Sequence, residues 1–123
     1  MQETVTSVLS TPAEIADRIA EVLSDKLALN IVLLDLAKQS NFADYFIVAA
    51  GDNERHMKAL RDAVDEAMSA AGLEPTHIEG TADSGWILID YGIVVVHIFS
   101  PALRSYYRLE ELWGKAAPVV HFP

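Results

Sequence analysis

Residues 86–99, which read WILIDYGIVVVHIF, constrain the fold of this chain more than any other stretch. Two apolar runs rich in β-branched residues flank Tyr91-Gly92, a pattern typical of an antiparallel hairpin with a two-residue turn. We therefore expect strands over 86–90 and 93–99. A turn at this position predicts three cross-strand pairs: Asp90 with Ile93, Leu88 with Val95, and Trp86 with His97.

The two faces of this predicted hairpin differ in chemistry. One face carries only aliphatic side chains and is expected to pack beneath a helix: Ile87, Ile89, Val94, Val96 and Ile98. The other face adds an indole, a carboxylate and an imidazole to its aliphatic side chains: Trp86, Leu88, Asp90, Ile93, Val95 and His97. Because an unpaired buried carboxylate costs several kcal/mol, we do not expect this second face to be fully buried.

Two interpretations of the second face remain open. An aromatic residue among aliphatic neighbours, with a few polar groups, is typical of the centre of a protein–protein interface. Alternatively, the helix after the hairpin folds back over this face and Asp90 pairs with an arginine there. Both depend on the turn, because a one-residue slip would exchange the two faces.

Capping signals predict where the helices begin. Thr11, Pro12 and Glu14 form a capping box with proline at the first helical position, and the helix should end near Lys26. A second helix follows a cap at Asp52 or Asn53 and carries one apolar stripe before Gly72. Ser100-Pro101 predicts a short helix towards Tyr107, with a further turn or two over 109–113.

Three more apolar runs predict strands over 30–36, 45–50 and 76–79. The first two are joined by a short link and should be antiparallel, whereas the second helix is long enough to connect parallel strands. We therefore expect an α/β fold, a mixed five-stranded sheet flanked by helices. The whole chain, 1–123, should be a single domain with flexible tails at 1–10 and 117–123.

Composition narrows the classes of function. The chain has no cysteine, which excludes disulfides and thiolate catalysis and fits a reducing cytoplasm. Its net charge is −9, with nine scattered Lys and Arg residues, so direct nucleic-acid binding is disfavoured. An acidic surface suits a basic protein partner, although such surfaces also serve solubility alone. With neither a secretory signal nor a membrane-length apolar run, we expect a cytoplasmic protein that binds no membrane.

Catalytic and metal-binding patterns are weak. The histidines do not have the spacing of metal ligands, so we expect neither a metal site nor a cofactor: His56, His77, His97 and His121. Ser84 does not lie in the strand-to-helix elbow of a serine hydrolase. The segment 51–53 could cradle a phosphate at the start of a helix, but it lacks further glycines or a lysine, and we interpret it as an N-cap turn. His97 is interpreted as a hydrogen-bonded strand residue.

Four segments together resemble one family, the ribosomal silencing factors of the RsfS/Iojap type: ADYFIVAAG (43–51), IEG (78–80), WILIDYGIVVVHIFS (86–100) and YRLEELW (107–113). The resemblance implies a fold with nucleotidyltransferase-like topology. It also implies binding to the large ribosomal subunit through the ribosomal protein L-fourteen. Such proteins block joining of the small subunit and silence translation when nutrients are scarce, and the family is not known for enzymatic activity.

The resemblance and the second hairpin face together predict the partner-binding residues: Trp86, Leu88, Asp90, His97, Arg104 and Tyr107. Trp86 and Asp90 match family positions implicated in binding the ribosomal protein. The sequence departs from the family pattern at Ile93 and Arg108, where an acid is usual, and both changes alter the charge near the proposed surface.

Two alternatives stay open. The first is a metal-dependent enzyme of the nucleotidyltransferase type, in which Asp35 would converge with Asp44 or Asp90 on a divalent cation. The separation of these carboxylates cannot be read from the sequence. The second is a homodimer that uses the same hairpin face against a second copy.

Overall fold

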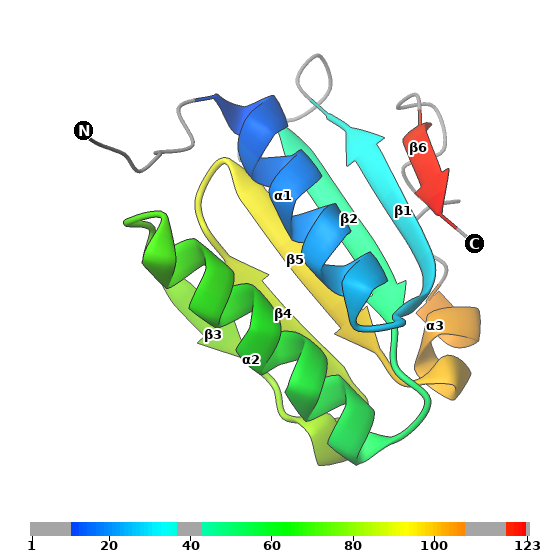
Figure 1. Ribbon diagram of the computed structural model, residues 1–123. Helices are drawn as coiled ribbons and strands as arrows, with labels where there is room; N and C mark the ends of the chain where they lie inside the picture. Colours follow the sequence, from blue (N-terminus) through cyan, green and yellow to red (C-terminus); the bar gives the residue numbers. More distant parts are fainter. Residues whose placement is uncertain (1–10, 37–42, 108–117, 123) are drawn as a thin grey trace.

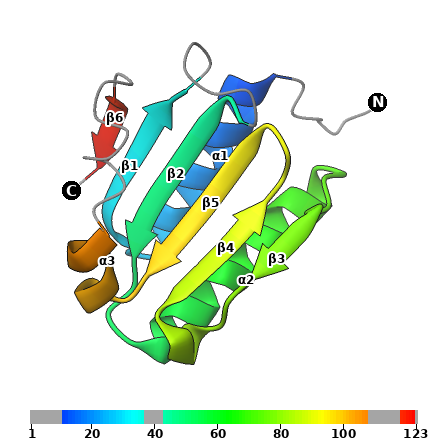
Figure 2. The ribbon, with the colours of Figure 1, turned by 180° about the vertical axis from the view of Figure 1, so that it is seen from behind.

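Two helices lie side by side over one face of a mixed sheet in the computed structural model (Figure 1). The structure describes residues 11–36, 43–107 and 118–122. Seen from behind, the strands stand in front of both helices (Figure 2). The elements follow one another along the chain: α1 (Pro12–Asp25), β1 (Leu29–Asp35), β2 (Tyr45–Ala50), α2 (Glu54–Ala70), β3 (His77–Glu79), a 3-10 turn (Ala82–Ser84), β4 (Trp86–Asp90), β5 (Val94–Phe99), α3 (Pro101–Tyr107) and β6 (Pro118–Phe122).

The predicted capping box starts α1. The amide of Glu14 donates to Thr11 Oγ1 at 3.1 Å, and the amide of Thr11 donates to Glu14 Oε1 at 3.1 Å. Residues at helical spacing then form a buried stripe, which includes Ile15, Ile19 and Leu23. This face of α1 packs on the sheet.

Asn53, one of the two predicted caps, starts α2. Its side-chain oxygen accepts the amide of His56 at 2.8 Å. The helix ends two residues before Gly72, whose φ of +84° is the left-handed conformation that favours glycine after a helix. The apolar stripe of α2 is buried against the sheet as predicted: Met57, Leu60, Val64 and Met68.

The strand order is β3-β4-β5-β2-β1-β6. β1 and β2 are antiparallel, and β2 is parallel to β5, so the chain between them, which contains α2, connects parallel strands. This confirms the predicted mixed α/β sheet, in which all five predicted strands are present.

Pro118–Phe122 adds a sixth strand, β6, which pairs antiparallel with β1 at the edge of the sheet. We expected these residues to belong to a flexible tail, and that expectation is corrected by the pairing. The pairing joins residues that are far apart in the sequence, so no local pattern predicts it. The tail predicted at 1–10 and the helical turn predicted over 109–113 lie outside the described residues.

The hairpin has the predicted faces but a different register. Its observed pairs are Trp86 with Phe99, Leu88 with His97 and Asp90 with Val95. The amide of Tyr91 donates to the carbonyl of Val94 at 2.9 Å, so Gly92 and Ile93 form the turn, and Gly92 has a φ of +89°. The predicted pairs are therefore wrong by two residues. Because side chains alternate with a period of two, this shift leaves the paired side chains on their predicted faces. The exception is Ile93, which was predicted on the second face and instead lies in the turn, while Phe99 takes a place on that face.

The aliphatic face of the hairpin belongs to the main core, as predicted. Its five side chains are at most 1% exposed and pack in one cluster with the buried stripes of α1 and α2: Ile87, Ile89, Val94, Val96 and Ile98. Among the helices that the structure describes, none is long and apolar enough to cross a lipid bilayer.

Candidate functional site

The opposite face of the hairpin is the candidate partner-binding surface. We call it the hairpin face and define it by six side chains: Trp86, Leu88 and Asp90 on β4, and Val95, His97 and Phe99 on β5. Neither α1 nor α2 covers it, as Figure 2 shows. The β4 residues are partly exposed, whereas those on β5 are buried, with exposures of 8, 4 and 0%.

The aromatic rings on this face form a cluster. The centroid of the Trp86 ring lies 5.0 Å from that of Phe99 and 5.9 Å from that of His97. The Phe46 ring on β2 packs edge-on against the His97 ring, with 4.8 Å between their centroids. The indole Nε1–H of Trp86 donates to Nδ1 of His97 at 3.2 Å. The partly exposed indole is therefore held in place by packing and by a hydrogen bond.

His97 is the acceptor in this bond, which places its remaining proton on Nε2 and leaves the ring neutral. Burial lowers the pKa of His97 to about 4. The imidazole is thus a hydrogen-bonded strand residue, as predicted.

Asp90 has a local role that the sequence did not reveal. Its Oδ1 accepts the amide of Gly92 at 2.7 Å, so this carboxylate stabilises the hairpin turn. An ion pair between Asp90 and an arginine of the following helix is not seen in the part of the chain that the structure describes. Asp90 nevertheless remains partly exposed on the hairpin face.

The described part of the helix after the hairpin packs at one end of the face. Leu103 of α3 and Trp86 both pack against the cluster of Val48 and Phe99, and Ser100 Oγ accepts the amide of Leu103 at 3.2 Å. In the described part of the chain, α3 packs against the same cluster as the indole, and the indole stays partly exposed.

The predicted site residues divide into two groups. Trp86, Leu88, Asp90 and His97 share one face, but His97 is only 4% exposed and supports the indole from beneath instead of forming open surface. Arg104 lies on α3 and is only 8% exposed, so it is not part of an open surface. Tyr107 is the last residue of α3, and its side chain lies outside the described part of the chain.

A groove of about 290 Å³ opens beside Trp86. Its lining comes from β3, the loop after it, β4 and α3: Glu79, Gly80, Ser84, Trp86, Leu88 and Leu103. Sequence reasoning found Trp86 and Leu88 but missed the other four. Only the pairing of β3 with β4, which sets Glu79 opposite Leu88, brings Glu79 to this place, and that pairing cannot be read from either strand alone.

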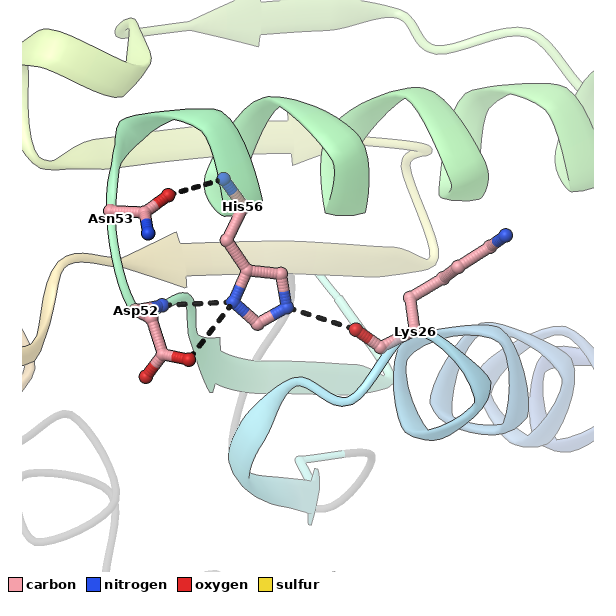
Figure 3. Close-up of polar contacts among 4 residues, drawn as sticks. All are labelled: Lys26, Asp52, Asn53 and His56. Carbon is pink, nitrogen blue, oxygen red and sulfur yellow. Dashed lines mark hydrogen bonds and ion pairs between the residues drawn. The ribbon is translucent and has the colours of Figure 1, made fainter.

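The turn at 51–53 is an N-cap, as interpreted from the sequence. The amide of Asp52, which would be needed to cradle a phosphate, donates to Nδ1 of His56 at 2.9 Å, a contact drawn in Figure 3. The other ring nitrogen of His56 lies 2.9 Å from the carbonyl oxygen of Lys26, where α1 ends. His56 therefore links the end of α1 to the start of α2, and this amide is already occupied.

The carboxylates of the alternative enzyme divide into a near pair and a distant one. Asp35 pairs across the strands with Tyr45, the neighbour of Asp44, whereas Asp90 lies further along the sheet. Within residues 11–36, 43–107 and 118–122, no three His, Cys, Asp or Glu side chains are placed to hold a metal ion. Asp35 ends β1 and Asp44 precedes β2, whereas Asp90 lies on β4, two strands away from β2.

Comparison with known proteins identifies the family. The sequence matches the family described as "RsfS: Ribosomal silencing factor during starvation" over residues 9–123. A ribosomal silencing factor RsfS from Chromobacterium violaceum is 39% identical over 105 residues, which cover 85% of this chain and 86% of that protein.

A solved structure agrees with this assignment. A crystal structure of a Chromobacterium violaceum protein is 37% identical, has a TM-score of 0.81, and covers 90% of this chain and 94% of its own. A mouse protein named mitochondrial assembly of ribosomal large subunit protein 1 is 26% identical over 100 residues, covering 79% of this chain and 44% of that protein. The chain belongs to the RsfS family of ribosomal silencing factors.

Proposed function

We propose that this protein binds the large ribosomal subunit through the ribosomal protein L-fourteen and blocks joining of the small subunit, which represses translation. It acts in the cytoplasm as a binding module and performs no chemistry. Family membership supports the proposal, and the name of the mouse relative concerns the same ribosomal subunit.

The observation that carries the proposal is the partly exposed apolar patch on the hairpin face. Trp86 and Leu88 lie on β4, the second strand from the edge of the sheet, and the indole is fixed by Phe99 and His97. A rigid aromatic anchor loses little conformational entropy on binding, which is why such residues are common hot spots.

Charge supports a basic protein as the partner. The net charge of −9 favours encounter with a positively charged surface and disfavours loose attachment to ribosomal RNA. The silencing effect is then steric, because a folded domain on the subunit interface occupies the space that the other subunit needs.

Co-sedimentation with purified large ribosomal subunits tests the proposal. Trp86→Ala should weaken binding by at least ~2 kcal/mol, or about thirtyfold, because it removes the anchor. Leu27→Ala is the matched control, since Leu27 is 77% exposed and lies outside the hairpin face. A folded Trp86→Ala variant that binds as tightly as the unaltered protein would show that the surface is misassigned.

The same preparations test the steric effect and the two alternatives. Light scattering of mixed subunits should show slower joining with the unaltered protein than with Trp86→Ala. Calorimetry with magnesium and a nucleoside triphosphate should show no tight binding, and binding that Asp35→Asn abolishes would favour an enzyme. Sedimentation equilibrium of the free protein tests whether the hairpin face instead pairs with a second copy.

A further inference from the structure

The groove beside Trp86 has an apolar wall and an acidic edge. Leu88 and Leu103 line it together with the indole, and Glu79 of β3 lines it beside Leu88. Glu79 pairs with Leu88 across the strands, so its side chain belongs to the same face of the sheet. The groove thus combines aliphatic, aromatic and carboxylate surfaces.

The IEG segment, 78–80, holds Glu79 at this position. Gly80 has a φ of +81°, and a Cβ on it would lie only 1.9 Å from the carbonyl oxygen of Trp86. Glycine therefore allows the end of β3 to approach the start of β4 closely. This gives a physical role to a segment that the sequence analysis noted only as part of a family resemblance.

Glu79 is better placed than Asp90 to receive a cation beside the indole. Asp90 uses Oδ1 to hold the turn at the far end of β4. The Glu79 side chain is 68% exposed, and its Oε2 lies 3.1 Å from Nε2 of His77, a contact that is an ion pair only when the imidazole is protonated. No hydrogen bond to Glu79 Oε1 is found within the described residues.

We propose that this groove receives an arginine side chain of the partner, with its methylene stem against Leu88, its guanidinium stacked on Trp86 and its charge paired with Glu79. The inference rests on the proposed function and specifies its partner contact. A planar guanidinium stacks on an indole and binds a carboxylate with two hydrogen bonds, which the compact, strongly hydrated ammonium of lysine does less well. A purely apolar side chain would leave Oε1 of Glu79 without a partner on docking.

The first experiment measures the affinity of the full chain for purified large ribosomal subunits at low and high salt. Glu79→Gln should weaken binding about tenfold at low salt, because a charge-assisted hydrogen bond is lost, and should reduce the salt dependence. Glu66→Gln is the matched control, since Glu66 is also exposed but lies on α2, on the other side of the sheet. Binding by Glu79→Gln at the unaltered affinity, or an equal loss with Glu66→Gln, would overturn the inference.

The second experiment needs no ribosome. N-acetyl-arginine amide should shift the nuclear magnetic resonance signal of the Trp86 indole N–H in the isotopically labelled chain. Its uncharged isostere N-acetyl-citrulline amide should not, and Glu79→Gln should abolish the arginine effect. An indole signal that does not shift with the arginine compound, or that shifts equally with the citrulline compound, would contradict the proposed arginine contact.

The two experiments separate the inference from the proposed function. If Trp86→Ala loses the large subunit but Glu79→Gln does not, the function stands and the arginine contact is wrong. If the unaltered chain fails to bind large subunits but its indole responds to arginine, the groove chemistry stands and the proposed function is wrong.

Discussion

One face of the β4–β5 hairpin is aliphatic and sealed by α1 and α2, whereas the other is aromatic, polar and partly exposed. Neighbouring residues of β4 therefore experience opposite environments. Ile87 is fully buried in the main core, and Leu88 lines an open groove. The difference indicates that the first face is selected for packing, whereas the second is compatible with binding and is stabilised by specific contacts such as the indole–imidazole hydrogen bond.

Truncation of neighbouring residues should give the largest contrast between the faces. Ile87→Ala should lower the free energy of unfolding by about 2–5 kcal/mol, because it leaves a cavity in a sealed core. Leu88→Ala should cost about 1 kcal/mol, because the side chain is already partly hydrated. Urea denaturation at neutral pH measures both, and equal costs would mean that the hairpin face is as buried as the core.

Acid should destabilise the hairpin face through His97. Its pKa is about 4 in the folded chain, below the ordinary 6.5, so the unfolded chain binds the proton more tightly. The stability associated with neutral His97 is complete above pH 6.5 and is lost as the pH falls, with a loss on the order of 3 kcal/mol by pH 4.

His97→Gln isolates this contribution, because glutamine does not titrate and the carboxylates of both proteins titrate alike. The free energy of unfolding, measured by urea denaturation between pH 7 and pH 4, should fall more steeply for the unaltered chain. Parallel pH profiles would show that the imidazole is not desolvated.

A charge placed on the open face should affect binding more than folding. Leu88→Lys should weaken binding to large ribosomal subunits by about 2 kcal/mol, because it sets an ammonium in an interface that we expect to meet a basic partner. Ala70→Lys adds the same charge to an exposed position on α2 and should leave the affinity unchanged. Similar losses in both variants would indicate a non-specific effect of net charge.

A substitution on the helical side of the sheet should have the smallest effect, and this effect should be on stability and not on binding. Asn53→Ala removes the hydrogen bond that caps α2 and should cost about 1 kcal/mol of unfolding free energy. Thermal denaturation and co-sedimentation measured together check this. A loss of ribosome binding in a folded Asn53→Ala variant would indicate that the interface lies on the helical side of the sheet.

The same contrast explains which parts of the fold could be predicted. Helix starts depend on adjacent residues, and Thr11 and Asn53 act as their local chemistry indicates. The faces of the hairpin could also be predicted, because alternation is local. The position of the turn could not be predicted, because glycine at position 92 fits either the first or the second residue of a two-residue turn. The structure has Gly92 as the first turn residue, and this shifts the cross-strand pairs by two residues.

Non-local pairing accounts for what was missed. β6 and β1 are far apart in the sequence and come together only when the chain folds. The residues of β6 alone show no strong strand pattern. Glu79 became a candidate only once β3 was seen beside β4. The role of Asp90 in the turn depended on the position of Gly92, which the predicted register misplaced.

Cysteine footprinting tests the central claim most directly, because the chain has no cysteine of its own. Leu88→Cys and Glu66→Cys place one thiol on each side of the sheet, and maleimide labelling of this chain is followed by mass spectrometry with and without saturating large ribosomal subunits. We predict that the subunits slow labelling at position 88 at least about tenfold, as expected for a residue near the centre of an interface, and leave position 66 unaffected. Protection at position 66 with unchanged labelling at position 88 would contradict the account.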